Sequence, residues 1–203
     1  PPFDTVADFL RGLRGVMLDM FRTPDKLIAA ADLFVQPQID SAVAWAKATA
    51  TPRVMMWLHR GAAGFMSNEQ YERFYWPSLQ KVILGIVDQG ITPILFCQGD
   101  YTPRLPFLAQ LPRGKVAIHF DQIDRQKAQA ALADRQCLWV PVPAGQLVTG
   151  TPQQVRDDVK SIIDTFAGAG GLIIDGSMGL PDETRPENVT AMVEAVADYG
   201  GVR

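Results

Sequence analysis

Residues 54–60 read VMMWLHR, in which five apolar residues are followed by His59 and Arg60. The apolar residues do not alternate with polar ones, and such a run is typical of a strand buried in a parallel sheet. The same pattern recurs further along the chain, and each run again ends in polar residues. The predicted strands are Val54–Leu58, Ile94–Cys97, Val116–Phe120, Leu138–Val142 and Leu172–Ile174.

Helix signals lie between these predicted strands. Residues 67–70 and 151–154 have the spacing of capping boxes, with Ser or Thr followed three residues later by Gln. The sequence therefore predicts a single domain. It consists of a helical lead-in over residues 1–50 and repeated strand and helix units over residues 51–203.

Repeated parallel units form either an open, doubly wound sheet or a barrel. An open sheet that binds dinucleotides has a glycine-rich loop after its first strand, but residues 59–64 read HRGAAG and lack the acidic ribose partner. We therefore favour an α/β fold that is a partial (β/α)8 TIM barrel, with about five βα units from the C-terminal part. Because five units cannot close the cylinder, we expect either an N-terminal barrel segment of roughly 150 residues or a homo-oligomer.

Composition and charge exclude several classes of partner. The chain has 22 acidic and 19 basic residues and a net charge of -3, so it offers no basic field for nucleic acid. No apolar run approaches the roughly 20 residues that a membrane span needs. Cys97 and Cys137 lie inside apolar runs, as expected for free thiols. We therefore expect a cytoplasmic protein that acts on a small molecule, without nucleic-acid or membrane partners.

Polar residues at the carboxyl ends of parallel strands are the first candidates for function, because active sites of such folds lie there. The candidate catalytic residues are His59, Asp100, His119 and Asp175. Histidine can act as a general base, and a carboxylate that leaves a dry strand can gain proton affinity. The predicted substrate-binding residues are Arg60, Gln98, Tyr101, Arg104, Gln146, Ser177 and Met178.

Each candidate also has a structural interpretation. Any strand leaves a sheet through polar residues, and a lone histidine is often only a hydrogen-bonded structural residue. Asp100 can begin an Asx turn, and Asp175 can cap the turn that follows its strand. The aromatic residues between positions 71 and 76 are better explained by core packing than by ligand binding.

Several motifs together resemble the uroporphyrinogen decarboxylase superfamily, over most of the chain from about residue 54 onward. These motifs are GFMS at 64–67 with FYWP at 74–77, CQGD at 97–100 with TPRL at 102–105, LVTGTP at 147–152, and GSMG at 176–179 with TRPEN at 184–188. The superfamily includes uroporphyrinogen decarboxylase and the corrinoid-dependent methyltransferases. The resemblance implies a (β/α)8 barrel in which the predicted strands are the fourth to the eighth.

The sequence also departs from the patterns of this superfamily. Its zinc-dependent methyltransferases carry a His-x-Cys pair after the fifth strand and a Cys after the eighth, where this chain has Phe96, Gln98 and Met178. Cys97 is shifted by one residue, which turns it to the opposite face of the strand. Because these ligand positions are replaced, we expect no metal site. The catalytic His of the decarboxylases is likewise replaced, by Met178, and their Arg-rich N-terminal loop has no counterpart in the sequence.

The leading hypothesis is methyl transfer between a corrinoid carrier and a small molecule, without zinc. No Asp-x-His-x-x-Gly segment of the corrinoid-binding kind is present, so we expect the corrinoid to arrive on a separate protein. One alternative is decarboxylation of uroporphyrinogen or another carboxylate, with Arg60 and Arg104 as the cationic groups. Another is a non-catalytic half-barrel that acts with a partner chain, because its open edge strands invite pairing.

Overall fold

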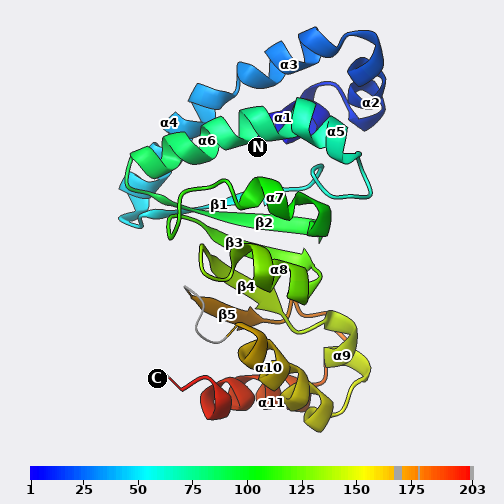
Figure 1. The fold of residues 1–203 in the computed structure, drawn as a ribbon, viewed down its shortest axis with the longest axis vertical. Helices are drawn as coiled ribbons and strands as arrows, with labels where there is room; N and C mark the ends of the chain where they lie inside the picture. The colour runs from blue at the N-terminus through cyan, green and yellow to red at the C-terminus, as the bar shows by residue number, and fades with distance from the viewer. Residues whose placement is uncertain (167–170, 178, 202–203) are drawn as a thin grey trace.

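The computed structural model describes residues 1–166, 171–177 and 179–201. Its centre is a five-stranded parallel sheet, and all the predicted strands are confirmed, with small differences at their ends. Figure 1 shows that the arrowheads of the strands point to the same edge of the sheet. The strands are β1 (Arg53–Leu58), β2 (Thr92–Asp100), β3 (Ala117–Gln122), β4 (Cys137–Pro141) and β5 (Leu172–Asp175).

The order of the strands decides between the two parallel architectures. The strands pair in chain order, β1-β2-β3-β4-β5, without the reversal of order that a doubly wound sheet contains. In a barrel, by contrast, each strand lies beside the next one in the sequence. The chain therefore has the α/β fold of a partial (β/α)8 barrel.

Helices connect the strands and also form the N-terminal region. The α-helices are α1 (Pro2–Thr5), α2 (Leu13–Arg22), α3 (Pro24–Asp32), α4 (Val35–Thr49), α5 (Asn68–Gln70), α6 (Trp76–Asp88), α7 (Leu105–Leu108), α8 (Arg125–Leu132), α9 (Ala144–Thr149), α10 (Pro152–Phe166) and α11 (Pro186–Tyr199). Two π-helical segments, η1 (Val6–Leu10) and η2 (Tyr71–Tyr75), and one 3-10 turn, η3 (Thr102–Arg104), complete the described elements. No helix in the described part of the chain is long and apolar enough to cross a membrane.

Both predicted capping boxes are present. The Ser67 hydroxyl accepts a hydrogen bond from the Gln70 N–H at 3.1 Å, and the Gln70 side chain accepts one from the Ser67 N–H at 3.0 Å. Thr151 and Gln154 form the same reciprocal pair at the start of α10. These bonds satisfy backbone N–H groups that a helix start leaves without partners, which fixes where α5 and α10 begin.

The two faces of the sheet have different surroundings. On one face, fully buried apolar residues such as Leu95, Ile118 and Leu138 belong to the hydrophobic core. The other face is covered only in part, because the side chains of Trp57 and Ile173 remain 48% and 40% exposed. Continuous apolar runs are typical of strands that are covered on both faces, whereas the described residues leave part of the second face open.

This second face carries an aromatic row across four strands. It consists of residues that pair with one another on neighbouring strands: Trp57 of β1, Phe96 of β2, His119 of β3 and Trp139 of β4. The ring of His119 stacks on Trp139 with 4.5 Å between centroids and meets Phe96 edge-on at 4.6 Å. In a closed barrel, residues at such positions form a packed layer of the interior.

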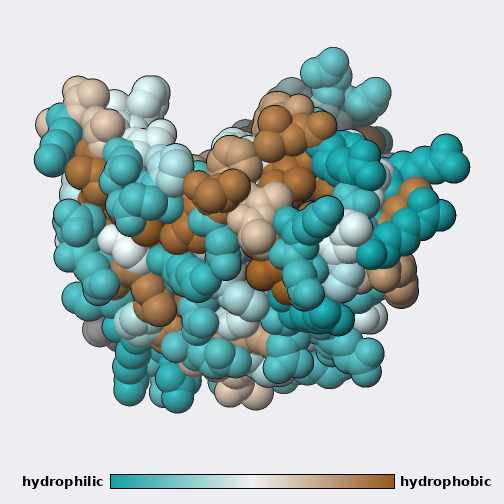
Figure 2. Space-filling model, turned by 90° about the horizontal axis from the view of Figure 1, so that it is seen from above, coloured by the Kyte–Doolittle hydropathy of each residue, from teal (hydrophilic) through white to brown (hydrophobic). Residues whose placement is uncertain are grey.

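The end of the molecule that carries α2, α3 and α4 also exposes hydrophobic surface, visible as brown areas in Figure 2. The most exposed large apolar residues of this N-terminal region are Phe9, Leu10, Phe21, Leu33 and Trp45. Contiguous apolar surface on a protein generally marks a place where another polypeptide packs.

Candidate active site

A cleft opens at the carboxyl ends of β1, β2 and β3, where the sequence predicts the candidate functional residues. It encloses about 710 Å³ and receives polar side chains from three strands and from the N-terminal helical region. Its lining residues are Asp8, His59, Arg60, Ala62, Gly64, Phe65, Gln98, Gly99, Asp100, Asp121 and Gln122.

His59 and Gln98 meet at this cleft. The Nδ1 atom of His59 forms a hydrogen bond with Oε1 of Gln98, which joins the ends of β1 and β2. Because an amide oxygen can only accept, this orientation of Gln98 assigns the proton to Nδ1. The neutral ring then keeps its lone pair at Nε2, the atom at which a histidine base takes up a proton.

The guanidinium of Arg60 is already paired. Its Nε atom donates to the Asp8 carboxylate at 2.7 Å, and its charged carbon lies 4.9 Å from the centre of the Phe65 ring. Both partners restrict the side chain, and Asp8 neutralises its charge. Among the described lining residues Arg60 is the only Lys or Arg, so the cleft as a whole is acidic.

Asp121 connects three strand ends. One carboxylate oxygen accepts a hydrogen bond from the backbone N–H of Gly99 at 2.9 Å, and the other accepts one from the Ser177 hydroxyl at 3.2 Å. The Ser177 N–H in turn donates to Asp175 at 3.1 Å. Asp121 follows His119 by two residues and therefore lies on the same face of β3. In the sequence, only its position at the end of a strand indicates that Asp121 belongs to the site.

His119 lies deeper, inside the aromatic row. Its side chain is almost fully buried, and Nε2 lies 3.3 Å from an oxygen of Asp175. This contact does not have the geometry of a hydrogen bond, and neither ring nitrogen has a hydrogen-bond partner among the described residues. The structure thus brings together two predicted catalytic residues, His119 and Asp175, one layer inside the cleft that holds His59 and Asp100.

Tyr101 and Arg104 do not face the cleft, contrary to the prediction that they bind substrate. Arg104 is buried and donates to the backbone carbonyls of Gly61 at 2.9 Å and Met66 at 2.6 Å. The Tyr101 hydroxyl donates to the carbonyl of Leu58 at 3.1 Å. Buried carbonyls need hydrogen-bond donors. Both side chains provide such donors from the interior of the protein and so fix the loop after β1.

Three further residues of the predicted site remain to be located. Asp100 lines the cleft and also accepts the N–H of Thr102 at 2.8 Å, so its Asx turn is confirmed. Gln146 lies on α9, where its amide donates to the Gln154 carbonyl at 2.8 Å beside a separate cavity. Met178 lies outside the described residues.

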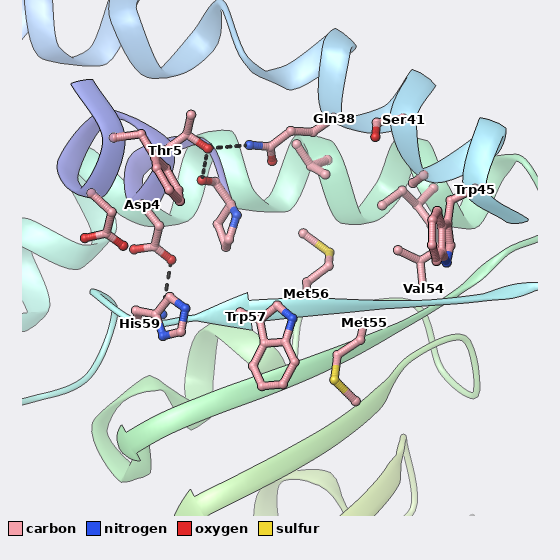
Figure 3. Close-up of a pocket in the computed structure, with 16 residues that line it drawn as sticks. Asp4, Thr5, Gln38, Ser41, Trp45, Val54, Met55, Met56, Trp57 and His59 are labelled. Atoms are coloured by element: carbon pink, nitrogen blue, oxygen red, sulfur yellow. Dashed lines mark hydrogen bonds between the residues drawn. The ribbon is translucent and has the colours of Figure 1, made fainter. Parts of the chain in front are cut away.

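A second cavity of about 590 Å³ lies between the N-terminal helices and the open edge of β1 (Figure 3). Asp4 and Thr5 of α1, Trp45 of α4, and Met55 and Trp57 of β1 are among its lining residues. Asp4 and Asp8 were not among the predicted site residues. They belong to the helical lead-in, where no local pattern distinguishes them from ordinary surface acids.

A parallel sheet in sequential order, with convergent polar side chains at its carboxyl edge, defines the class of (β/α)-barrel proteins. The chain belongs to the uroporphyrinogen decarboxylase (URO-D) family, whose model matches residues 2–199. The match includes the N-terminal helices as well as the region from residue 54 onward, so it extends beyond the motifs of the resemblance.

Two relatives place this match in context. A uroporphyrinogen decarboxylase from Dechloromonas aromatica (strain RCB) is 27% identical over 141 residues, which cover 67% of this chain and 39% of that protein. A solved structure, a methyltransferase from Methanosarcina mazei, matches 98% of this chain and 57% of its own length, with a TM-score of 0.79 and 21% identity. The chain therefore spans about two fifths to three fifths of the length of these relatives.

The zinc site of the family's methyltransferases does not fit these residues. Phe96 belongs to the aromatic row and Gln98 pairs with His59, while Cys97 is buried on the opposite face. Burial also raises the pKa of the Cys97 thiol well above its usual range, which disfavours the thiolate that zinc binds. Among the described residues, no three His, Cys, Asp or Glu side chains are grouped so as to hold a metal ion.

Proposed function

We propose that this chain provides the C-terminal strands of a barrel enzyme that moves a methyl group between a corrinoid and a small molecule, without zinc. The single observation that supports this proposal most is the chemistry of the cleft. It combines a histidine whose Nε2 can accept a proton with three carboxylates and one neutralised arginine. Such a cleft suits an acceptor that carries a transferable proton and no large negative charge.

In the proposed reaction, His59 and the carboxylates act on the acceptor. A methylated corrinoid, delivered by a separate protein, would supply the methyl carbon to this acceptor and would retain the electron pair of the broken bond. His59 takes the proton of the acceptor at Nε2, and the lone pair that this frees forms the new bond to carbon. Gln98 holds the imidazole in the required tautomer, and Asp121 fixes the neighbouring strand ends. No step of this reaction uses zinc.

A methyl-transfer assay tests this proposal. Methylcobalamin is mixed with the purified protein, together with the polypeptide that completes its barrel, and with a panel of thiols, amines and alcohols. Loss of the methylated form is followed by absorbance. We expect transfer to at least one acceptor, and we expect His59→Gln to slow it about 10²- to 10⁴-fold. Asp134→Asn, a change at an exposed surface position, is the matched control. Absence of transfer across the panel, or full activity of His59→Gln, would contradict the proposal.

Decarboxylation of uroporphyrinogen is the second candidate, and the Dechloromonas relative of that name supports it. A substrate with many carboxylates needs several cationic groups, and the described lining offers Arg60 alone, already bound to Asp8. We therefore expect no saturable binding of uroporphyrinogen in a calorimetric titration. Tight binding that Arg60→Met abolishes would favour decarboxylation instead.

A further polypeptide is part of the proposal. The outer edge of β1 is unpaired in the described sheet, and the cavity beside it is lined by Trp45, Met55 and Trp57. We propose that an N-terminal barrel segment or a second copy of the chain adds to this edge. Sedimentation of the isolated chain should then show self-association, and a stable monomer at all concentrations would argue against the second copy.

We propose that the reaction takes place in the cytoplasm, because both cysteines are free thiols.

A further inference from the structure

Asp4 is a buried carboxylate that lies outside the cleft but contacts its backbone. It belongs to α1, its side chain is one of the few charged groups of the core, and it points at the end of β1 (Figure 3). Its Oδ2 atom accepts the N–H of His59 at 3.1 Å and the hydroxyl of Tyr75 at 2.8 Å. Its Oδ1 atom accepts the N–H of Arg60 at 3.0 Å.

These contacts satisfy the backbone at the point where β1 leaves the sheet. His59 and Arg60 follow the last residue of the strand, so their N–H groups have no further ladder to join on β2. A buried N–H without an acceptor costs about 1–3 kcal/mol. Asp4 provides an acceptor for each of them and thereby fixes the direction in which both side chains leave the strand.

The contacts also explain why this position holds a carboxylate. Burial raises the pKa of Asp4, so the charged form is costly at this site, and the hydrogen bonds from Tyr75, His59 and Arg60 oppose that effect. An asparagine would have almost the same shape but only one acceptor atom, and its NH2 group would face an N–H donor. Only a carboxylate of this size accepts from both backbone groups at once.

We propose that Asp4 is a positioning residue for the cleft, which holds His59 toward Gln98 and Arg60 toward Asp8 through the two backbone N–H groups at the end of β1. Its importance for catalysis rests on the proposed function, because His59 and Arg60 matter only if the cleft is the active site. Its structural effect does not, because the orientation of His59 can be measured without any reaction.

The presence of only two histidines makes this effect measurable by NMR. In protein with isotope-labelled histidine, the signals of His59 and His119 are assigned by comparison with His59→Gln. We expect Asp4→Asn to shift the backbone N–H and ring signals of His59 and to leave those of His119 unchanged. Asp25→Asn is the matched control, because the same chemical change is made at a side chain that is 95% exposed. Unchanged His59 signals in folded Asp4→Asn would overturn the proposal.

Hydrogen exchange of the unaltered protein gives a second measurement, which does not require Asp4→Asn to fold. We expect the N–H groups of His59 and Arg60 to exchange slowly, at rates like those inside β1, although both residues lie beyond the strand. Exchange as fast as that of Gly64 in the following loop would overturn the proposal. If both measurements agree with the proposal and no methyl transfer is found, the proposed function fails while the role of Asp4 in orienting His59 stands.

Discussion

The carboxylate of Asp121 accepts a hydrogen bond from the hydroxyl of Ser177 at 3.2 Å, which connects the end of β3 to the segment after β5. The strand between them, β4, is bypassed by this contact. Since the same carboxylate also accepts the N–H of Gly99, one side chain holds the ends of β2, β3 and β5 at fixed positions around the cleft.

Replacement of Asp121 tests this role. We expect Asp121→Ala to lower the free energy of unfolding by about 1–3 kcal/mol, because the Gly99 N–H and the Ser177 hydroxyl both lose their acceptor. Asp121→Asn keeps one acceptor atom and should lower it less. Urea denaturation measures both effects, with the exposed Asp134→Asn as the control. Equal stability of Asp121→Ala and the control would show that these bonds contribute nothing to the fold.

Two glycines in the loop after β1 form a natural comparison. A Cβ atom at Gly61 would lie 2.9 Å from the Tyr75 ring and 3.0 Å from the Tyr71 ring, and it would also collide with the Tyr101 hydroxyl. The same atom at Gly64 meets nothing within 4 Å. We therefore expect Gly61→Ala to destabilise the protein by about 1–3 kcal/mol. Gly64→Ala should be nearly neutral in the same denaturation experiment, and similar losses for both would contradict this packing.

Arg104 should be sensitive even to a conservative change. Arg104→Met leaves the carbonyls of Gly61 and Met66 without donors, and each such loss costs about 1–3 kcal/mol. Arg104→Lys keeps the charge but loses the planar fork that reaches both carbonyls, so we expect destabilisation there too. Thermal unfolding should show a fall of about 2–4 °C for each kcal/mol lost. Arg113→Lys, at an exposed position, should leave the melting temperature unchanged.

The pH dependence of stability should reveal Asp4. Burial raises its pKa above the ordinary value of 3.8, so the folded protein binds this proton more tightly than the unfolded chain does. The stabilisation that results is fully present below pH 3.8 and is lost as the pH rises through the folded pKa. Unfolding free energies of the unaltered protein minus those of Asp4→Asn should therefore fall with rising pH. A difference that increases with pH would contradict the raised pKa.

The sequence predicted the strands well because each one is a local apolar run with a polar end. It also placed His59, Gln98 and Asp100 at one edge, since consecutive parallel strands end side by side. It failed for Asp4 and Asp8, whose partners lie 52 or more positions away in the chain, so no spacing could have indicated the contacts. The predicted location of Tyr101 and Arg104 in the cleft was wrong for a different reason. Their residue types fit a binding loop, but only the folded backbone determines that they point inward.

The aromatic row gives the molecule an optical signal of its own. Trp57 is about half exposed, whereas the ring of Trp139 is stacked on that of the buried His119. The emission of an indole moves to shorter wavelengths when water is replaced by apolar surroundings. A polypeptide that closes over the open face would cover the exposed indole of Trp57, so completion of the barrel can be followed by intrinsic fluorescence, without any label.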